Sequence, residues 1–273
     1  MLRFSPAAQN FIAEGGSYKE MFDNGAIDIY TGSQPATADL APTGTLLVTI
    51  TSGAGALTNE TRAVGVVTLS VGSTTGDNVT TFTLSGVEIK GKTTNWNTSL
   101  TQTAADVCTD INRCPSNKMV VATSSGAVIT LTARPGFGTY LNGAALAVGV
   151  AGSMSAAITS TTFGSATGGG VQGVAAVNGL RMDYNATAGV MTKDTSQTWS
   201  GTAVGAGTQT AGWFRYRSSK ADAGALDSAT PPVYMRMDGA IATSGSEMNM
   251  SSTSITNGAL QTLSTFAFTV PAA

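Results

Sequence analysis

Aspartates are the residues of this sequence most able to bind a metal ion, because Ca²⁺ needs only oxygen ligands. Two groups qualify by position: Asp222, Asp227 and Asp238 toward the end, and Asp23 with Asp28 near the start. A calcium-binding loop of the DxDxDG type gathers its ligands through a fixed short spacing. That spacing occurs nowhere in the sequence. We therefore interpret these residues as solvated carboxylates and predict no metal site.

Paired carboxylates can also hydrolyse glycosidic bonds, provided that a cleft holds them at a controlled separation. The candidate pairs are Glu88 with Asp106 and Asp183 with Asp194. Nothing in their spacing places either pair across a cleft. The 3 Trp and 6 Tyr residues are spread over the whole length and predict no platform for stacking sugars. The pattern does not favour a hydrolase.

Histidine is absent from the sequence, which excludes Ser/His/Asp and Cys/His nucleophiles and His-based zinc sites. The two cysteines, Cys108 and Cys114, are too few for a disulfide framework and lack CxxC spacing. On a helix they would lie about 9 Å apart, beyond the roughly 7 Å limit for a bridge. We predict two free thiols, no catalytic residue, no cofactor and no enzymatic activity.

The glycine-rich segment 164–173 contains the letters of a dinucleotide-binding motif, because Gly168, Gly170 and Gly173 stand at GxGxxG spacing. That motif binds a pyrophosphate only where a strand precedes it and a helix follows. Here Asn178-Gly179 interrupts the following segment, so no such helix is predicted. We interpret residues 164–173 as a hinge.

The segment from Trp213 to Arg217 predicts a strand with two distinct faces. Trp213, Arg215 and Arg217 share one face, and Phe214 and Tyr216 share the other. Alternating basic and aromatic residues can bind single-stranded nucleic acid. However, the formal net charge is −2, and nucleic-acid surfaces need clustered Lys and Arg. We expect a cross-strand ion-pair ladder with segment 234–238 and no nucleic-acid partner.

The composition indicates which elements must position these side chains. The 273 residues include 33 glycines, and only 11% are charged, against roughly 25% in an average soluble domain. This balance favours short strands and tight turns. The predicted fold class is mainly β, with a β-sandwich or barrel-like domain. We expect no signal peptide and no membrane partner, because no apolar run reaches the roughly 18 residues of a membrane span.

Two short helices are predicted before the first strand. Ser5-Pro6 has the pattern of an N-cap followed by proline, and Ser17 with Glu20 has the capping-box pattern. Residues 1–24 would thus form a helical arm, whose apolar side chains must dock on its own domain or on a neighbour. Deleting residues 1–24 should leave a folded chain that no longer joins its neighbours. These apolar residues are Phe4, Phe11, Ile12, Met21 and Phe22.

Residues 25–60 and 174–273 alternate apolar and polar side chains at strand period. The strands at the start have too few partners to form a stable sheet, so we predict one discontinuous β domain from both segments. Residues 31–45 contain Pro35 and Pro42. Because proline has no backbone N–H to donate to a neighbouring strand, this segment predicts an ordered loop. The expected strands are 26–30, 46–50, 180–184, 189–191, 212–217, 233–238, 248–250 and 266–270.

Residues 61–173 predict an inserted α+β module of ββαββ type that ends in the glycine-rich hinge. Its helix covers Ala104–Arg113, since apolar residues repeat there at helical spacing. Thr101 or Thr103 would cap its start, and Pro115 would stop it. Strands at 119–123 and 127–133 are expected to follow as a hairpin.

Several of these segments resemble a signature of tailed-bacteriophage virion proteins. The resemblance covers roughly residues 20–55 and 174–270, and the middle module looks like β-rich insertions that recur in phage structural proteins. The residues that carry it are NGAIDIYTGSQPATAD at 24–39, APTGTLL at 41–47, GWFR at 212–215, MDGAIATSG at 237–245 and MNM at 248–250.

The resemblance implies a structural component of the virion, made in the host bacterial cytoplasm and placed on the particle exterior. Its expected partners are copies of itself and other virion proteins, namely major capsid, neck or tail subunits. Capsid decoration or cementing is the favoured role. A neck or tail protein, including a receptor- or glycan-binding appendage, is the alternative. The candidate subunit contacts are Phe4, Phe11, Ile12, Met21, Phe22, Gln34, Pro35 and Pro42.

Overall fold

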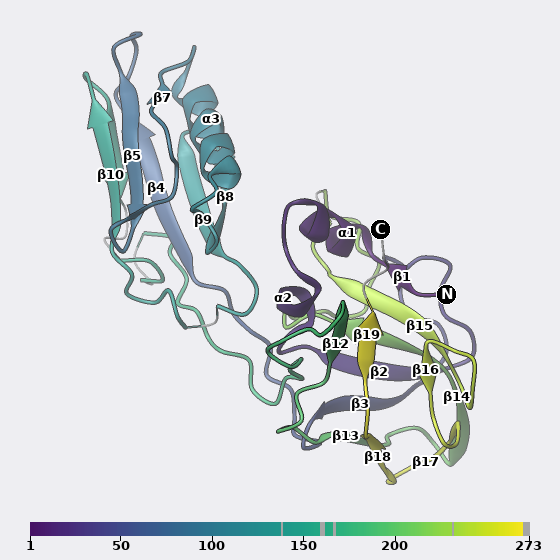
Figure 1. Ribbon diagram of the computed structural model, residues 1–273. Helices are drawn as coiled ribbons and strands as arrows, with labels where there is room; N and C mark the ends of the chain where they lie inside the picture. The colour runs from purple at the N-terminus through teal and green to yellow at the C-terminus, as the bar shows by residue number, and fades with distance from the viewer. Residues whose placement is uncertain (138, 159–161, 166–167, 231, 270–273) are drawn as a thin grey trace. The chain divides into compact units, whose positions relative to one another are not determined.

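The computed structural model of the chain describes residues 1–137, 139–158, 162–165, 168–230 and 232–269. The fold is mainly β, with several antiparallel sheets and one helix in an α+β region, which confirms the predicted class (Figure 1). Within the described residues the strands form no closed barrel. The chain separates into two compact units: unit 1 comprises residues 1–60 and 176–273, and unit 2 comprises residues 61–175.

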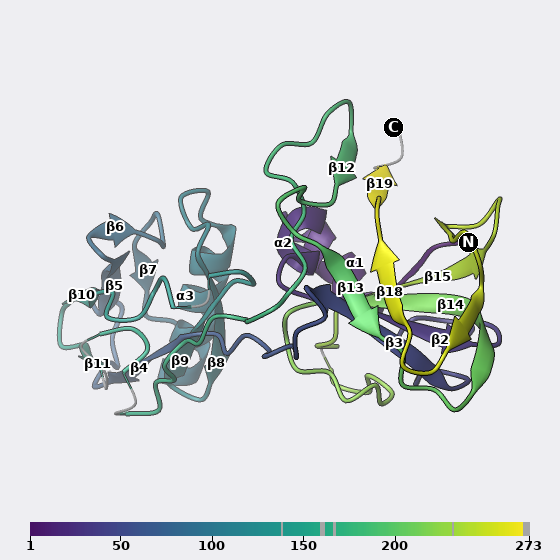
Figure 2. The same cartoon turned by 90° about the horizontal axis from the view of Figure 1, so that it is seen from below.

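A nine-stranded sheet organises unit 1, in the order β1-β15-β14-β2-β3-β13-β18, with β16 beside β15 and β17 beside β14. Figure 2 shows strands β15, β14, β2, β3, β13 and β18 of this sheet. A separate antiparallel pair consists of β12 and β19. Two helices, α1 (Pro6–Ala13) and α2 (Tyr18–Phe22), precede β2. The strand bounds are β1 Arg3–Phe4, β2 Ala26–Thr31, β3 Leu46–Ser52, β12 Val190–Thr192, β13 Trp199–Thr202, β14 Thr208–Arg217, β15 Arg236–Ala242, β16 Met248–Asn249, β17 Ser254–Thr256, β18 Leu260–Leu263 and β19 Ala267–Thr269.

The two N-terminal helices begin where their capping patterns predict. The Ser5 hydroxyl accepts the N–H of Ala8 at 3.3 Å, which satisfies one of the free donors at the start of α1. At α2 the Ser17 hydroxyl accepts the Glu20 N–H at 3.1 Å, and the Glu20 carboxylate accepts the Ser17 N–H at 3.3 Å. This is the predicted capping box.

The helical arm is an integral part of unit 1. Met21 and Phe22 are buried in its hydrophobic core, and each such side chain contributes roughly 1.5–3 kcal/mol. Ser5 is buried as well, and its hydroxyl donates to the Tyr234 carbonyl and accepts the Arg236 N–H. The arm therefore docks on its own unit, and deleting residues 1–24 would open the core rather than leave a folded chain.

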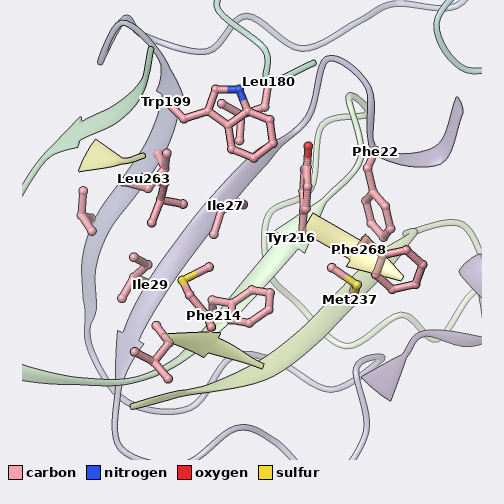
Figure 3. Close-up of a cluster of buried hydrophobic side chains, with 14 of the residues drawn as sticks. Phe22, Ile27, Ile29, Leu180, Trp199, Phe214, Tyr216, Met237, Leu263 and Phe268 are labelled. Atoms are coloured by element: carbon pink, nitrogen blue, oxygen red, sulfur yellow. The ribbon is translucent and has the colours of Figure 1, made fainter. Parts of the chain in front are cut away.

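The core of unit 1 lies on one face of the nine-stranded sheet (Figure 3). Phe214 and Tyr216 of β14 point into it, as their alternation with the arginines predicts. The Tyr216 ring stacks on Phe22 with 4.6 Å between ring centroids, which fastens α2 to the sheet. Burial raises the pKa of the Tyr216 hydroxyl well above its ordinary value.

Unit 2 contains two four-stranded sheets that share a core with one helix. One sheet has the order β11-β4-β9-β8; the other has the order β10-β5-β6, with β7 beside β5. The main elements follow the predicted ββαββ order, β4, β5, α3, β8 and β9, before β10 and β11. The bounds are β4 Val64–Ser70, β5 Asn78–Leu84, β6 Val87–Glu88, β7 Thr94–Asn95, α3 Leu100–Arg113, β8 Val120–Ser125, β9 Val128–Ala133, β10 Leu146–Ala151 and β11 Ser155–Ile158.

The helix of unit 2 starts earlier than its apolar pattern predicts. Ser99 is the N-cap of α3, and its hydroxyl accepts the Gln102 N–H at 3.1 Å. Neither Thr101 nor Thr103 caps the helix; the buried Thr103 hydroxyl instead donates to the Ser99 carbonyl. The prediction was wrong here because the first turn is mostly polar, so apolar periodicity could not detect it.

Two expected strands of unit 1 also need correction. Residues 180–184 form no strand: Leu180 and Met182 make only isolated bridges, to Gly25 and Lys193. The strand expected at 233–238 lies at β15, Arg236–Ala242, because Asp227 holds the backbone of Val233 and the residue after it in a loop. Val270, at the end of the expected strand 266–270, lies outside the described residues.

The glycine-rich segment also has a defined structure where it is described. Gly168–Gly173 belongs to unit 2, and Val171 within this segment bridges Val64. Residues 174–180, which follow the GxGxxG letters, form isolated bridges and contain no helix. Residues 166 and 167 of the predicted hinge lie outside the described residues. In the part of the chain described here, no helix is both long and apolar enough to cross a membrane.

Candidate functional site

The outer face of the unit 1 sheet carries a row of charged side chains. Arg215 of β14 lies directly opposite Asp28 of β2 on one side and Asp238 of β15 on the other. Because side chains alternate along a strand, Trp213 and Arg217 share this face with Arg215. The predicted cross-strand ion-pair ladder is therefore present, and it uses both neighbours of β14.

The central pair of this ladder is buried. The Arg215 Nε donates to Asp238 Oδ1 at 2.8 Å, and its Nη2 donates to Oδ2 at 2.7 Å. Asp238 is 0% exposed. Its burial raises its pKa, although the hydrogen bonds and charge of Arg215 oppose that rise. Removal of either partner would leave a buried charge uncompensated, which costs about 3–5 kcal/mol.

A second, less buried pair flanks the first. The Arg217 Nε donates to Asp28 Oδ2 at 2.8 Å, and the Thr49 hydroxyl of β3 donates to Oδ1 at 2.7 Å. Next along the sheet, the Tyr30 ring stacks on Trp213 with 4.5 Å between centroids. Burial, followed by the charge of Asp28, raises the pKa of Tyr30 to about 12.

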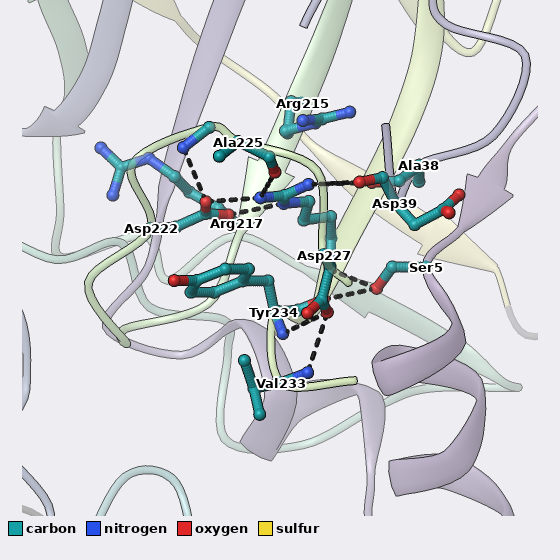
Figure 4. Close-up of polar contacts among 12 residues, drawn as sticks. Ser5, Ala38, Asp39, Arg215, Arg217, Asp222, Ala225, Asp227, Val233 and Tyr234 are labelled. Atoms are coloured by element: carbon teal, nitrogen blue, oxygen red, sulfur yellow. Dashed lines mark hydrogen bonds and ion pairs between the residues drawn. The ribbon is translucent and has the colours of Figure 1, made fainter. Parts of the chain in front are cut away.

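Arg236 joins two loops to the sheet. Figure 4 shows the acceptor residues of these loops, Asp222 and Ala225 from one and Asp39 from the other. This side chain is 0% exposed. Its Nε and Nη2 donate to the two Asp222 carboxylate oxygens, each at 2.6 Å, and Nη2 also donates to the Ala225 carbonyl at 2.7 Å. Its Nη1 donates to the Asp39 carbonyl at 3.0 Å. One guanidinium thus fixes segment 218–230, through Asp222 and Ala225, and loop 32–45, through Asp39.

The Asp222 carboxylate responds to this arrangement. Burial alone would raise its pKa, but the hydrogen bonds and charge of Arg236 and the Gly224 N–H outweigh burial. The pKa of Asp222 therefore lies below its ordinary value of 3.8. Asp222 remains charged at neutral pH, as the bidentate contact requires.

Loop 32–45 is further fixed by single hydrogen bonds along its length. The Trp213 indole N–H donates to the Thr43 carbonyl at 3.1 Å, and Arg215 Nη2 donates to the Leu40 carbonyl at 3.1 Å. Arg3 donates to the Pro35 carbonyl, and the Gln34 amide donates to the Met1 carbonyl. Thr31, the first residue of the predicted loop 31–45, belongs to β2; residues 32–45 contain no strand, and their carbonyl groups are satisfied by the arginines and by Trp213.

The predicted subunit contacts have different degrees of exposure. Met21, Phe22 and Pro35 are buried within unit 1, so this structure does not present them to a partner. Gln34 and Pro42 are partly exposed in loop 32–45. The remaining three, Phe4, Phe11 and Ile12, are partly buried against the unit 1 core.

The other chemical candidates are engaged in local contacts. Among the residues named as calcium candidates, Asp227 accepts the backbone N–H groups of Val233 and Tyr234, and Asp23 pairs with Lys19. No cluster of three or more metal-binding side chains occurs in the described ranges. Both thiols are buried and free, as predicted, and burial raises the pKa of Cys108 to about 11.

Three of the four acids suggested as hydrolase pairs make local contacts, whereas the Asp183 side chain is exposed. The Glu88 carboxylate accepts the N–H groups of Phe82 and Lys90, and Asp194 pairs with Arg181. The Asp106 carboxylate accepts hydrogen bonds from the neighbouring amide side chains of Asn97 and Gln102.

The contact between Arg236 and Asp222 was missed from the sequence. A signal for it exists, because an arginine in a buried strand needs a carboxylate partner. The segment between β14 and β15 offers Asp222 and Asp227 for this role. Residues 234–238 alternate in strand pattern, which places Arg236 in a strand and thus indicates that its partner lies among these two aspartates.

The fold and this ladder define a mainly β protein in which paired charges hold two long loops in fixed positions. Such an arrangement offers a shaped, hydrogen-bonded surface. Comparison with known proteins adds no relative: the chain matches no protein-family profile, no curated protein and no solved structure.

Proposed function

We propose that the chain is a structural component of a tailed-bacteriophage virion that binds neighbouring subunits on the particle exterior, with capsid decoration or cementing as its role. The proposal assigns it no catalytic step. The stretches that resemble virion proteins, 24–39, 41–47, 212–215, 237–245 and 248–250, all belong to unit 1, where they contribute to β2, loop 32–45, β14 and β15.

The observation that carries the proposal is the fixed conformation of loop 32–45. Ordering a flexible loop at an interface costs free energy, which a loop held in place beforehand avoids. Arg236, Arg215 and Trp213 already hold this loop through its carbonyl groups. On a symmetric particle, many copies of such a modest contact add up to firm attachment.

Leu40 gives this proposal a sharp test, because its side chain lies in the loop and is 38% exposed while its carbonyl oxygen accepts the arginine hydrogen bonds. Leu40→Glu should leave the fold intact and abolish cosedimentation of the full-length chain with tailed-phage particles assembled without it. Leu260→Glu is the matched control, since Leu260 is 62% exposed on the edge strand β18. That variant should bind as the unmodified chain does.

Three outcomes would count against the proposal. If the unmodified chain does not cosediment with particles, the structural role is wrong. If it binds host cells or surface polysaccharide and not particles, the receptor- or glycan-binding alternative is favoured. If Leu40→Glu binds as well as Leu260→Glu, loop 32–45 is not the contact surface.

A further inference from the structure

A polar groove in unit 2 has no part in the proposed attachment. It has a volume of about 470 Å³, within the roughly 300–1,000 Å³ range of small-molecule sites. One wall is the segment 92–97, which includes β7, and the other is the last two turns of α3. Its side chains are almost all polar or charged, apart from the Trp96 ring.

Part of the groove is held rigid by its own hydrogen bonds. The Thr94 hydroxyl donates to Asp110 Oδ2 at 2.6 Å, and Lys92 Nζ lies 2.9 Å from Asp110 Oδ1. The Asn97 amide donates to Asp106 Oδ2 at 2.9 Å. These contacts connect the two walls, and each carboxylate oxygen retains a lone pair for a further donor.

Other groups in the groove are available for a ligand. Asn95 and Arg113 are exposed, and their side chains make no hydrogen bond or ion pair with any part of the chain that the structure describes. Asn95 offers both a donor and an acceptor, and Arg113 offers five donors. A ligand could therefore bind these groups without first breaking an internal contact.

The charges in the groove balance. Lys92 and Arg113 supply two positive charges, and Asp106 and Asp110 supply two negative charges. Neither an anion nor a cation gains a net electrostatic advantage from such a site. The groove suits a neutral ligand whose groups both donate and accept hydrogen bonds.

Trp96 adds an apolar surface to this polar groove. Trp96 is one of the lining residues and is partly exposed although it also packs against the unit 2 core, whereas Trp199 and Trp213 are buried in unit 1. An indole presents a broad apolar face. Saccharides match both features, because their hydroxyls donate and accept hydrogen bonds and their C–H faces are apolar.

We propose that the groove between segment 92–97 and α3 binds a neutral saccharide. An extended peptide is the less favoured occupant, because peptide recognition draws its specificity from pockets for side chains, and the lining of this groove is almost entirely polar or charged. The inference goes beyond the proposed attachment role, and it depends on unit 2 alone.

The test uses the full-length chain and an array of neutral and acidic oligosaccharides built from hexoses and N-acetylhexosamines. We expect binding to neutral members and quenching of tryptophan fluorescence, which would report Trp96 because the other two indoles are buried. Asn95→Ala and Arg113→Ala should each weaken the affinity about tenfold. Lys118→Ala is the control, since Lys118 is exposed in the same unit and does not line the groove.

Each contrary outcome overturns a defined part of the proposal. Failure to bind any saccharide on the array, or binding of peptides instead, rejects the ligand class. A preference for acidic members contradicts the argument from charge balance. Affinity that is equal in Asn95→Ala, Arg113→Ala and Lys118→Ala places the site elsewhere. None of these results bears on cosedimentation with particles, so the two proposals fail independently.

Discussion

Replacing Arg236 by lysine tests whether one guanidinium holds both loops of unit 1. The substitution keeps the positive charge and removes the planar fork of donors. Arg236 donates to four oxygen atoms at 3.0 Å or less: two on Asp222, one on Ala225 and one on Asp39. These acceptors belong to two loops on different sides of the guanidinium.

The size of the effect follows from those contacts. A lysine ammonium carries three donors on one atom, so it cannot meet four acceptors in two loops. We expect it to keep Asp222 and lose the contacts to one loop, which leaves about two buried acceptors without a donor. At roughly 1–2 kcal/mol for each, Arg236→Lys should lower the free energy of unfolding by about 2–4 kcal/mol.

The matched control is Arg217→Lys on the same sheet face. Arg217 is 16% exposed and makes a single short bond, to Asp28. Water can replace what it loses, so a change under about 1 kcal/mol is expected. Urea denaturation measures both free energies, and amide hydrogen exchange follows loop 32–45 directly. Equal small losses in the two variants would refute the claim that Arg236 fixes the loops.

Two further predictions concern backbone geometry and pH. Gly212→Ala should destabilise unit 1 by about 2–3 kcal/mol in a denaturation experiment, because an added Cβ would meet the Gly32 carbonyl oxygen. Gly76→Ala is the control and should change stability little, because its Cβ would make only an ordinary contact, 4.0 Å from the Thr74 hydroxyl oxygen. Backbone N–H groups, that of Ser73 foremost, hold the pKa of Asp77 below its ordinary value of 3.8. The ionised Asp77 carboxylate therefore stabilises the folded chain fully above pH 3.8, and this stabilisation is lost as the pH falls through the lower folded pKa. Asp77→Asn should thus make the free energy of unfolding in urea less sensitive to acid below pH 3.8. Equal acid sensitivity in the two proteins would contradict this prediction.

Local signals in the sequence predicted much of the fold. The caps at Ser5 and Ser17 involve residues three positions apart, so their hydrogen bonds could be read from the letters alone. The two faces of β14 followed from simple alternation, and the structure places Phe214 in the core and Arg215 in the ladder. Contacts within one turn or one strand need no knowledge of the tertiary structure.

Elements that depend on distant partners were not predicted. The strand β13, Trp199–Thr202, contains glycine and polar residues and forms because it pairs with β3 and β18. The same holds for β17 and β18, whose few residues carry little pattern. The Arg236–Asp222 pair joins a strand to a loop without periodicity, so alternation could indicate the arginine but not its partner.

Position on a virus particle is the most direct test of the central claim. Tailed-phage particles assembled with the full-length chain can be labelled with an antibody to it and imaged by electron microscopy. We predict label at regularly repeated sites on the outer surface. Particles that assemble normally and carry no label, with all of the chain left in the soluble fraction, would contradict the account.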